Sequence, residues 1–176
     1  MSLKISKSSI RILGLDPGSH ITGVGVVDVQ GSQLIHQHHQ VIRAPKATLE
    51  KRLIYLFEAL KDLSHSYQPD VVVVERVFLG KNVDSAFKLG HARGVALMAL
   101  YQGGGQIFEI SAREVKKILT GSGSASKEQV RQMVGQWLKI DFQDKEMDVS
   151  DALSLAISGS FEYEKRLRLK QLEGEL

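Results

Sequence analysis

Residues 10–28 constrain the fold of this chain more strongly than any other segment. The segment begins with a short apolar run that ends at Asp16 and a Pro-Gly pair, and an apolar, β-branched run resumes at residue 22. This pattern predicts a buried strand, a tight turn and a second strand that pairs back on the first. Asp16 would then lie where a buried strand meets solvent. An aspartate before Pro-Gly also favours a turn, so a purely structural role for Asp16 stays open at this point.

Length and composition indicate one globular domain. A chain of 176 residues can bury a core, and we expect the domain to span residues 10–162, with 1–9 and 163–176 as flexible termini. The absence of cysteine excludes disulfides and thiolate zinc sites and permits a reducing compartment. No apolar run approaches the ~18 residues that a membrane span requires. We therefore expect a cytoplasmic protein without membrane association.

The distribution of charge is more informative than the net charge of +3, which is too small to indicate a nucleic-acid partner. Residues 76–131 hold nine lysines and arginines against four acidic residues, whereas acidic residues are in excess from residue 141 onward. A basic middle beside an acidic end suggests an anionic partner for the middle. An ordinary solvated surface would produce the same distribution, so this alternative stays open.

The remaining patterns predict an α/β domain. A third strand over 33–42 would complete an antiparallel meander, and the valine run at 71–74 is typical of a strand buried on both faces. Capping boxes that begin at Ser111 and Ser126 indicate two helices, and the second would bury Val130, Met133, Val134, Trp137 and Leu138. Further helices are expected over 47–66, 83–101 and 148–168, and a strand over 107–110. The order predicts a mixed five-stranded sheet with helices on both faces.

Two carboxylates stand at the carboxyl ends of predicted strands. Asp16 ends the first apolar run, and Glu75 ends the run that begins at Val71. If these strands are parallel neighbours, ~4.8 Å apart, their carboxylates emerge side by side at the edge where open α/β sheets bind ligands. Two like charges so placed repel each other unless a proton or a cation lies between them.

The last predicted helix supplies two more carboxylates. Asp148 and Asp151 are three residues apart and share a helix face, which should pack on the sheet. Taken singly, Asp148 could be a helix N-cap, and Asp151 could interact with the positive end of the helix. Taken with the strand ends, the four form an all-oxygen set that selects hard cations such as Mg²⁺ or Mn²⁺. Such sets commonly hold two ions for phosphodiester hydrolysis.

Five motifs in register resemble the RuvC family of Holliday-junction resolvases. They are Leu-Asp-Pro-Gly at 15–18 with Thr-Gly at 22–23, Val-Glu-Arg-Val-Phe at 74–78, Leu-Gly-His-Ala-Arg-Gly at 89–94, Gly-Ser-Gly-Ser-Ala-Ser-Lys at 121–127 and Asp-Val-Ser-Asp-Ala-Leu at 148–153. The resemblance covers roughly residues 10 to 160, nearly the whole predicted domain. No single motif is decisive, but the five together are highly specific.

The resemblance implies a ribonuclease-H-like fold and a homodimer in which each subunit nicks one of two opposed strands of a four-way DNA junction, in recombination and repair. It implies two Mg²⁺ ions per subunit, with Mn²⁺ as a substitute, and a branch-migration motor of the RuvA–RuvB type as a partner. Asp16, Glu75, Asp148 and Asp151 match the family's catalytic and metal-binding positions. The helix over 83–101 would help to form the dimer.

The resemblance also assigns DNA contacts. Lys116 and Lys127 match positions that contact phosphate near the cut, and Phe78 matches an aromatic residue at the disrupted bases of the junction. From pattern alone, Phe78 could instead be a core residue and Lys116 a solvated lysine. Lys127 stands in the first turn of a predicted helix, where the macrodipole disfavours a cation, and this favours a phosphate contact. Arg93 receives no role beyond contacts with DNA or the dimer partner.

Three other functions stay open from the sequence. Actin-like ATPases and sugar kinases also begin with a strand that ends in Asp-x-Gly, but they need two such domains. Small ribosomal-RNA-processing nucleases resemble this family, but they are shorter and are not expected to carry the segment 121–127. A catalytically silent junction-binding module is the third, and the presence of all four carboxylates argues against it.

Overall fold

The computed structural model describes residues 9–76, 83–142 and 147–173. Its elements follow the predicted order. The strands are β1 (Ile10–Asp16), β2 (Ile21–Gln30), β3 (Gln33–Arg43), β4 (Val71–Glu75) and β5 (Gln106–Ile110). The helices are α1 (Leu49–Tyr67), α2 (Val83–Tyr101), α3 (Ala112–Thr120), α4 (Lys127–Leu138) and α5 (Met147–Leu172).

The strands form one mixed sheet in the order β3-β2-β1-β4-β5. β1 pairs antiparallel with β2 and parallel with β4, and β4 pairs parallel with β5. The β1–β4 ladder includes the pair Leu15–Val74, so the carboxyl ends of these two strands reach the same edge of the sheet. The predicted mixed five-stranded sheet is therefore confirmed, and so is the parallel pairing on which the predicted site depends.

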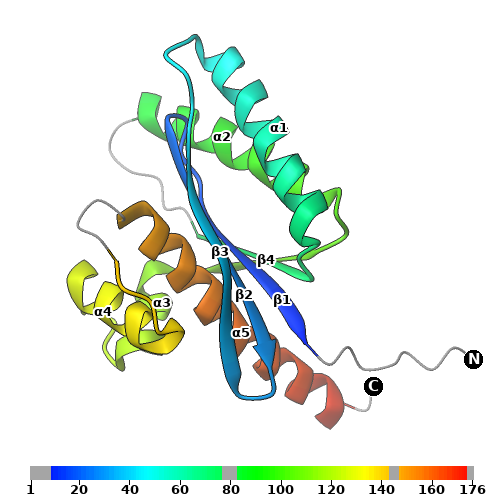
Figure 1. Cartoon of the computed structure of the whole chain (residues 1–176), viewed down its shortest axis with the longest axis vertical. Helices are drawn as coiled ribbons and strands as arrows, with labels where there is room; N and C mark the ends of the chain where they lie inside the picture. Colours follow the sequence, from blue (N-terminus) through cyan, green and yellow to red (C-terminus); the bar gives the residue numbers. More distant parts are fainter. Residues whose placement is uncertain (1–8, 77–82, 143–146, 174–176) are drawn as a thin grey trace, which may run out of the picture.

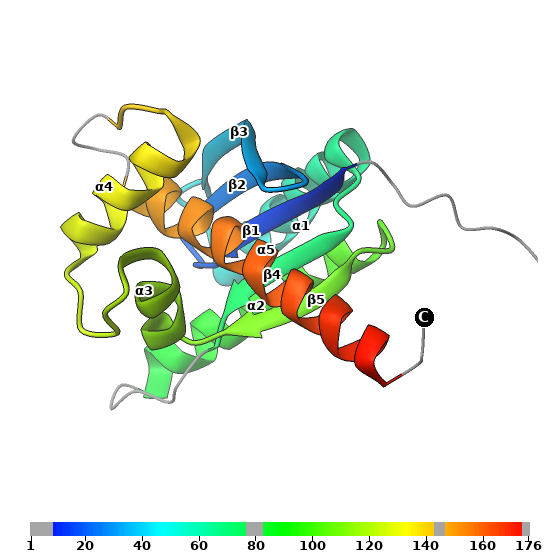
Figure 2. The same cartoon turned by 90° about the horizontal axis from the view of Figure 1, so that it is seen from below.

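Apolar cores cover both faces of the sheet because successive side chains of a strand point to opposite faces. Ile12 and Val73 belong to the core beneath α3, α4 and α5, whereas Leu13 and Val72 belong to the core beneath α1 and α2. Figures 1 and 2 show this arrangement, with α1 and α2 on one side of the sheet and α5 crossing the other side next to α3 and α4. The edge of the sheet at which β1 and β4 end therefore lies between the layer of α1 and α2 and the layer of α3, α4 and α5.

Helix α5 approaches the sheet unusually closely. A Cβ atom at Gly14 of β1 would lie 1.9 Å from the backbone oxygen of Ala152, and one at Gly23 of β2 would lie 2.1 Å from that of Asp148. A side chain at either position would collide with the helix backbone, so the two glycines permit this approach. The first turns of α5 consequently rest directly on β1 and β2.

The buried stripe of α4 differs from the prediction at one residue. Val130, Val134 and Leu138 are buried, and Met133 packs beside them. Trp137, however, is 37% exposed, and its ring lies edge-on to that of Phe161 with 5.5 Å between the centroids. The prediction that Trp137 is buried is wrong because the large indole covers a neighbouring ring at the rim of the core, a common place for tryptophan.

Helix α5 continues through Leu172, past the predicted helix end at 168 and the expected domain limit at 162. Tyr163 packs on the core, and the Arg166 guanidinium lies 3.9 Å from the centroid of the Phe108 ring, within cation–π range. The helix therefore still contacts β5 beyond residue 162. The domain limits and the flexibility of the termini stay predictions, and residues 1–8 and 174–176 lie outside the described part.

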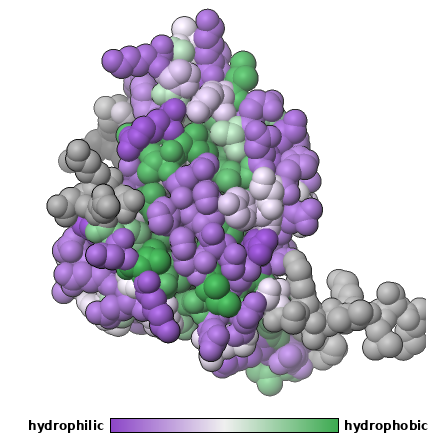
Figure 3. All heavy atoms as spheres, in the orientation of Figure 1, coloured by the Kyte–Doolittle hydropathy of each residue, from purple (hydrophilic) through white to green (hydrophobic). Residues whose placement is uncertain are grey.

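The surface seen in Figure 3 is mostly hydrophilic, with apolar residues in small patches between polar ones. This is expected when most large apolar side chains fill a core. Throughout the described ranges, no helix combines the length and the apolar character that crossing a membrane would require. A cytoplasmic location stays a prediction.

Candidate active site

The four acidic residues come from two strand ends and one helix. Asp16 is the last residue of β1, and Glu75 is the last residue of β4. In both strands the residues two and four positions earlier face α5, so the alternation of side chains directs both carboxylates toward that helix. Asp148 and Asp151 lie in the first turns of α5, which rest on β1 and β2. The structure thus places all four on the same side of the sheet, near one edge.

The carboxyl group of Asp16 is strongly perturbed by its surroundings. Burial, together with the charges of Asp151, Glu75 and Asp148, raises the pKa of Asp16 to about 7. The ammonium group of Lys127 opposes this rise in pKa. A carboxyl group in this environment keeps its proton below neutral pH unless a cation compensates its charge. Such perturbed groups gather at functional sites, which favours a catalytic role over a mere turn residue.

Glu75 experiences the same electrostatic field. Partial burial of its carboxyl group and the charge of Asp151 raise the pKa of Glu75, although the residue as a whole is exposed. Lys127 and Lys116 lower that pKa. Lys116 is half-buried on α3, and Lys127 is the first residue of α4. Both lysines therefore act on the acidic cluster from helices that carry none of its carboxylates.

Lys127 also contacts the cluster directly. Its Nζ donates a hydrogen bond to Oδ2 of Asp151 at 2.7 Å, and this bond raises the pKa of Lys127. The capping box of Ser126 and Gln129 fixes the start of α4 and hence the origin of this side chain. Because the Lys127 side chain is 66% exposed, the ion pair contributes at most about 1 kcal/mol to stability. Lys127 can therefore exchange this partner for another at low cost.

The structure describes two of the three residues that are predicted to contact DNA. Lys116 and Lys127 both lie within electrostatic range of the acidic cluster. Phe78 falls within 77–82, outside the described residues, so its role stays a prediction. The phosphate contacts of the two lysines stay predictions as well.

The donor set suits hard divalent cations. Across the described ranges, no three acidic or histidine side chains are already arranged as ligands of one ion. The cluster nevertheless offers only carboxylate oxygens, and mutual repulsion contributes to the raised pKa values of Asp16 and Glu75. Mg²⁺ and Mn²⁺ take oxygen ligands and would relieve this repulsion. The residues present therefore fit such a cation.

Comparison with known proteins identifies the family. The family model described as crossover junction endodeoxyribonuclease RuvC matches residues 12–159. The chain belongs to the RuvC family. A RuvC relative from Bdellovibrio bacteriovorus is 42% identical over 164 residues, which cover 93% of this chain and 97% of the relative. A RuvC relative from Proteus mirabilis is 44% identical over 147 residues, which cover 84% of each chain.

A solved structure supports the same assignment. Thermus thermophilus RuvC in complex with Holliday junction substrate matches with a TM-score of 0.82 and 29% identity, covering 88% of this chain and 94% of that chain. The ribonuclease-H-like fold that the resemblance implies is therefore confirmed. Membership of the RuvC family also sets aside the actin-like ATPases, sugar kinases and ribosomal-RNA-processing nucleases.

Two features of this RuvC-family site were missed from the sequence. Gly14 and Gly23 admit the backbone of α5, and a glycine inside a predicted strand is a sequence signal for such an approach. Arg93 donates hydrogen bonds to Glu75 and Glu109, which lie 18 and 16 residues away along the chain. No local pattern signals contacts at that separation.

Proposed function

We propose that this chain is a structure-specific endonuclease that resolves four-way DNA junctions by paired, symmetric nicks in homologous recombination and DNA repair. The proposal rests on the gathering of four carboxylates from β1, β4 and α5, where burial and the charges of the other three raise the pKa of Asp16. The relatives named above are crossover junction endodeoxyribonucleases, and the Thermus thermophilus protein was solved with a Holliday junction. An all-carboxylate site matches hydrolysis of a phosphodiester bond.

We assign the binding of Mg²⁺, with Mn²⁺ as a substitute, to Asp16, Glu75, Asp148 and Asp151, with two ions per subunit. When bound, such ions activate the attacking water and stabilise the leaving 3′-oxygen. The chain's own contribution is rigidity: the β1–β4 ladder aligns the two strand ends, and the close contacts at Gly14 and Gly23 fix α5 above them.

The DNA contacts would come from Lys116, Lys127 and Phe78. The two lysines offset the negative charge of the cluster and would attract the phosphate backbone to the cut. Phe78 follows Glu75 by three residues and would stack on unpaired bases near the cut. Such a stacking contact is worth ~1–3 kcal/mol.

Replacing Lys127 by alanine is expected to weaken junction binding. The slope of log affinity against log salt should become shallower by about one unit, because one phosphate contact is lost. Fluorescence anisotropy with a labelled junction over a series of salt concentrations measures this slope. Lys51→Ala, at an exposed position of α1, is the matched control and should leave the slope unchanged. An unchanged slope in Lys127→Ala would mean that this lysine pairs with Asp151 and contacts no phosphate.

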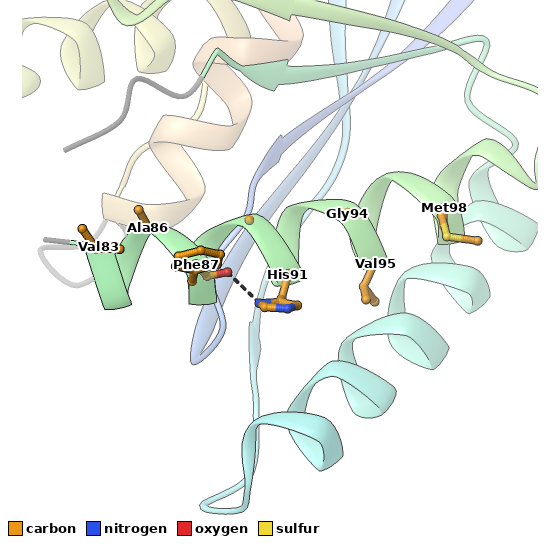
Figure 4. A pocket seen from close by; sticks show the side chains of 8 residues that line it. Val83, Ala86, Phe87, His91, Gly94, Val95 and Met98 are labelled. Atoms are coloured by element: carbon orange, nitrogen blue, oxygen red, sulfur yellow. Dashed lines mark hydrogen bonds between the residues drawn. The ribbon is translucent and has the colours of Figure 1, made fainter.

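A second copy of this chain would dock on an apolar groove of α2. The groove is open to solvent, has a volume of about 750 Å³ and is lined by Val83, Ala86, Phe87, Gly90, His91, Gly94, Val95 and Met98. Figure 4 shows Phe87, His91, Val95 and Met98 along one side of the helix. Phe87 and Met98 are each 66% exposed, and exposed apolar patches of this kind mark interaction surfaces. The small residues Ala86, Gly90 and Gly94 lie in this lining, where they would allow close helix packing.

Phe87→Asp is expected to convert the dimer to a monomer. Burying a carboxylate in an apolar interface should cost about 2 kcal/mol or more, or about 30-fold in the dimer dissociation constant. Analytical ultracentrifugation measures the change, and coordinated nicking of both strands should be lost with it. Ile54→Asp introduces the same charge at an apolar residue of α1 that is 64% exposed, and it should leave the dimer intact. An unchanged dimer in Phe87→Asp would place the interface elsewhere.

Delivery of junctions by a branch-migration motor of the RuvA–RuvB type also belongs to this proposal. Its support is the resemblance to the RuvC family. Co-sedimentation of the chain with such a motor on junction DNA would test it.

The central experiment is cleavage of a labelled four-way junction beside a linear duplex and an RNA–DNA hybrid, each with Mg²⁺ and with EDTA. We expect paired, symmetric nicks on the junction alone, and only with the metal present. Cleavage of the hybrid with the junction intact would indicate an RNA nuclease instead. Tight junction binding without cleavage in any divalent metal would indicate a binding module.

A further inference from the structure

Arg93 lies on α2, the helix that carries the apolar groove, and contacts the end of β4, the strand that ends at Glu75. Its Nη1 donates a hydrogen bond to the backbone carbonyl of Glu75 at 3.2 Å, and its Nη2 donates to Oε1 of Glu109 at 2.5 Å. The side chain is only 14% exposed. A single guanidinium therefore holds the last residue of β4 and a side chain of β5 at once.

The sheet geometry explains why this contact matters at Glu75. The β1–β4 ladder ends at the pair Leu15–Val74, so Glu75 lies beyond the last paired residue on that side. A backbone carbonyl at such a place can accept a hydrogen bond from a donor outside the sheet. Arg93 supplies one from the α2 layer, while the Glu75 side chain points toward α5.

Glu109 holds the guanidinium in place. It lies between Phe108 and Ile110, which both face the α5 layer, so alternation directs Glu109 toward the layer of α2. The planar guanidinium presents its donors in a fixed fork, so pairing with Glu109 orients Nη1 toward the Glu75 carbonyl. Beyond Glu75, the N–H of Arg76 donates to the carbonyl of Ile110 at 2.9 Å. The end of β4 is thus held by both α2 and β5.

We propose that Arg93 is a positioning residue for Glu75, oriented by Glu109. It acts on the backbone behind the carboxylate and touches neither DNA nor the scissile bond. This inference rests on the proposed function, because it assumes that Glu75 is a catalytic carboxylate. Since α2 also carries the groove, Arg93 is a direct link between the proposed dimer helix and the active-site strand.

The test compares variants of Arg93 with a matched ion pair on the same helix. Arg93→Met removes both hydrogen bonds, Arg93→Lys keeps the charge without the fork, and Glu109→Gln removes the orienting charge. Lys88→Met is the control, because Lys88 forms an exposed ion pair with Asp84 on α2 without touching Glu75. Each variant is measured for single-turnover junction cleavage, junction affinity, oligomeric state and Mn²⁺ binding by calorimetry.

Arg93→Met should slow cleavage and weaken Mn²⁺ binding by about 10- to 100-fold, the usual effect of losing a residue that orients a metal ligand. The dissociation constants of the junction complex and of the dimer should each change less than twofold. Arg93→Lys and Glu109→Gln should fall between wild type and Arg93→Met, and Lys88→Met should match wild type. Wild-type cleavage and Mn²⁺ affinity in folded Arg93→Met would overturn the proposal. If the wild-type chain does not cleave junctions, the proposed function fails, and the Mn²⁺ affinities alone decide whether Arg93 positions Glu75.

Discussion

Asp16→Asn is expected to abolish cleavage of a four-way junction while junction binding stays intact or becomes tighter. The substitution removes a proposed metal ligand and one negative charge close to where a phosphate would lie. Its amide keeps the size of the side chain, so the strand end should keep its shape. Gel-based cleavage assays and anisotropy on the same junction separate the two effects.

Asp62→Asn is the matched control for this prediction. It makes the same chemical change at an exposed position of α1, on the opposite face of the sheet from α5, and should alter neither cleavage nor binding. An equal loss of cleavage and binding in Asp16→Asn would contradict a purely catalytic role. It would indicate that Asp16 shapes the DNA-binding surface.

The same variant tests the electrostatics of the metal-free site. Because the pKa of Asp16 is about 7 in the folded chain, against an ordinary value of 3.8, the native state binds more protons than the unfolded state between these values. The contribution of Asp16 to the free energy of unfolding should therefore fall as pH rises from about 4 to about 7. In EDTA at pH 8, Asp16→Asn should be more stable than wild type, and this advantage should shrink toward pH 4. Parallel stability profiles for the two proteins would mean that the pKa of Asp16 is not raised.

Gly14→Ala is expected to destabilise the chain severely and to abolish cleavage in the molecules that still fold. The added methyl group would lie 1.9 Å from the backbone oxygen of Ala152, which cannot move without displacing α5. Overpacking of a core costs about 1–3 kcal/mol and occasionally more, and a clash with backbone belongs at the upper end. The displacement would also carry Asp148 and Asp151 away from Asp16. Chemical denaturation and junction cleavage measure the two consequences.

Gly90→Ala is the control for the stability measurement. It adds the same methyl group at a helical glycine that has nothing within 4 Å of the added atom. Alanine is favoured over glycine inside a helix by about 1 kcal/mol. Because Gly90 lines the proposed dimer groove, the comparison is made in the monomeric background Phe87→Asp, where Gly90→Ala should be no less stable than its parent. A Gly14→Ala variant of wild-type stability would show that α5 does not approach β1 as closely as described.

The sequence by itself determined which segments form strands, the order of these strands along the chain and the candidate carboxylates. The apolar runs that end at Asp16 and Glu75 are local patterns, and a strand buried on both faces needs such a run whatever surrounds it. The capping boxes of Ser111 and Ser126 are likewise local, because their hydrogen bonds join residues three apart, and both are present. Five motifs in register were sufficient to indicate the RuvC family, and the family match confirms it.

Only the tertiary structure decided how these pieces meet. Packing determined that α5 rests on Gly14 and Gly23, that Lys127 reaches Asp151 across 24 residues, and that Arg93 holds the Glu75 carbonyl. Packing also placed Trp137 at the rim of the core, although its helical position predicted burial. Each of these contacts joins residues distant in sequence, and periodicity describes only a residue's relation to its near neighbours. The pKa of Asp16 has the same origin, because it depends on burial and on charges that three other elements bring together.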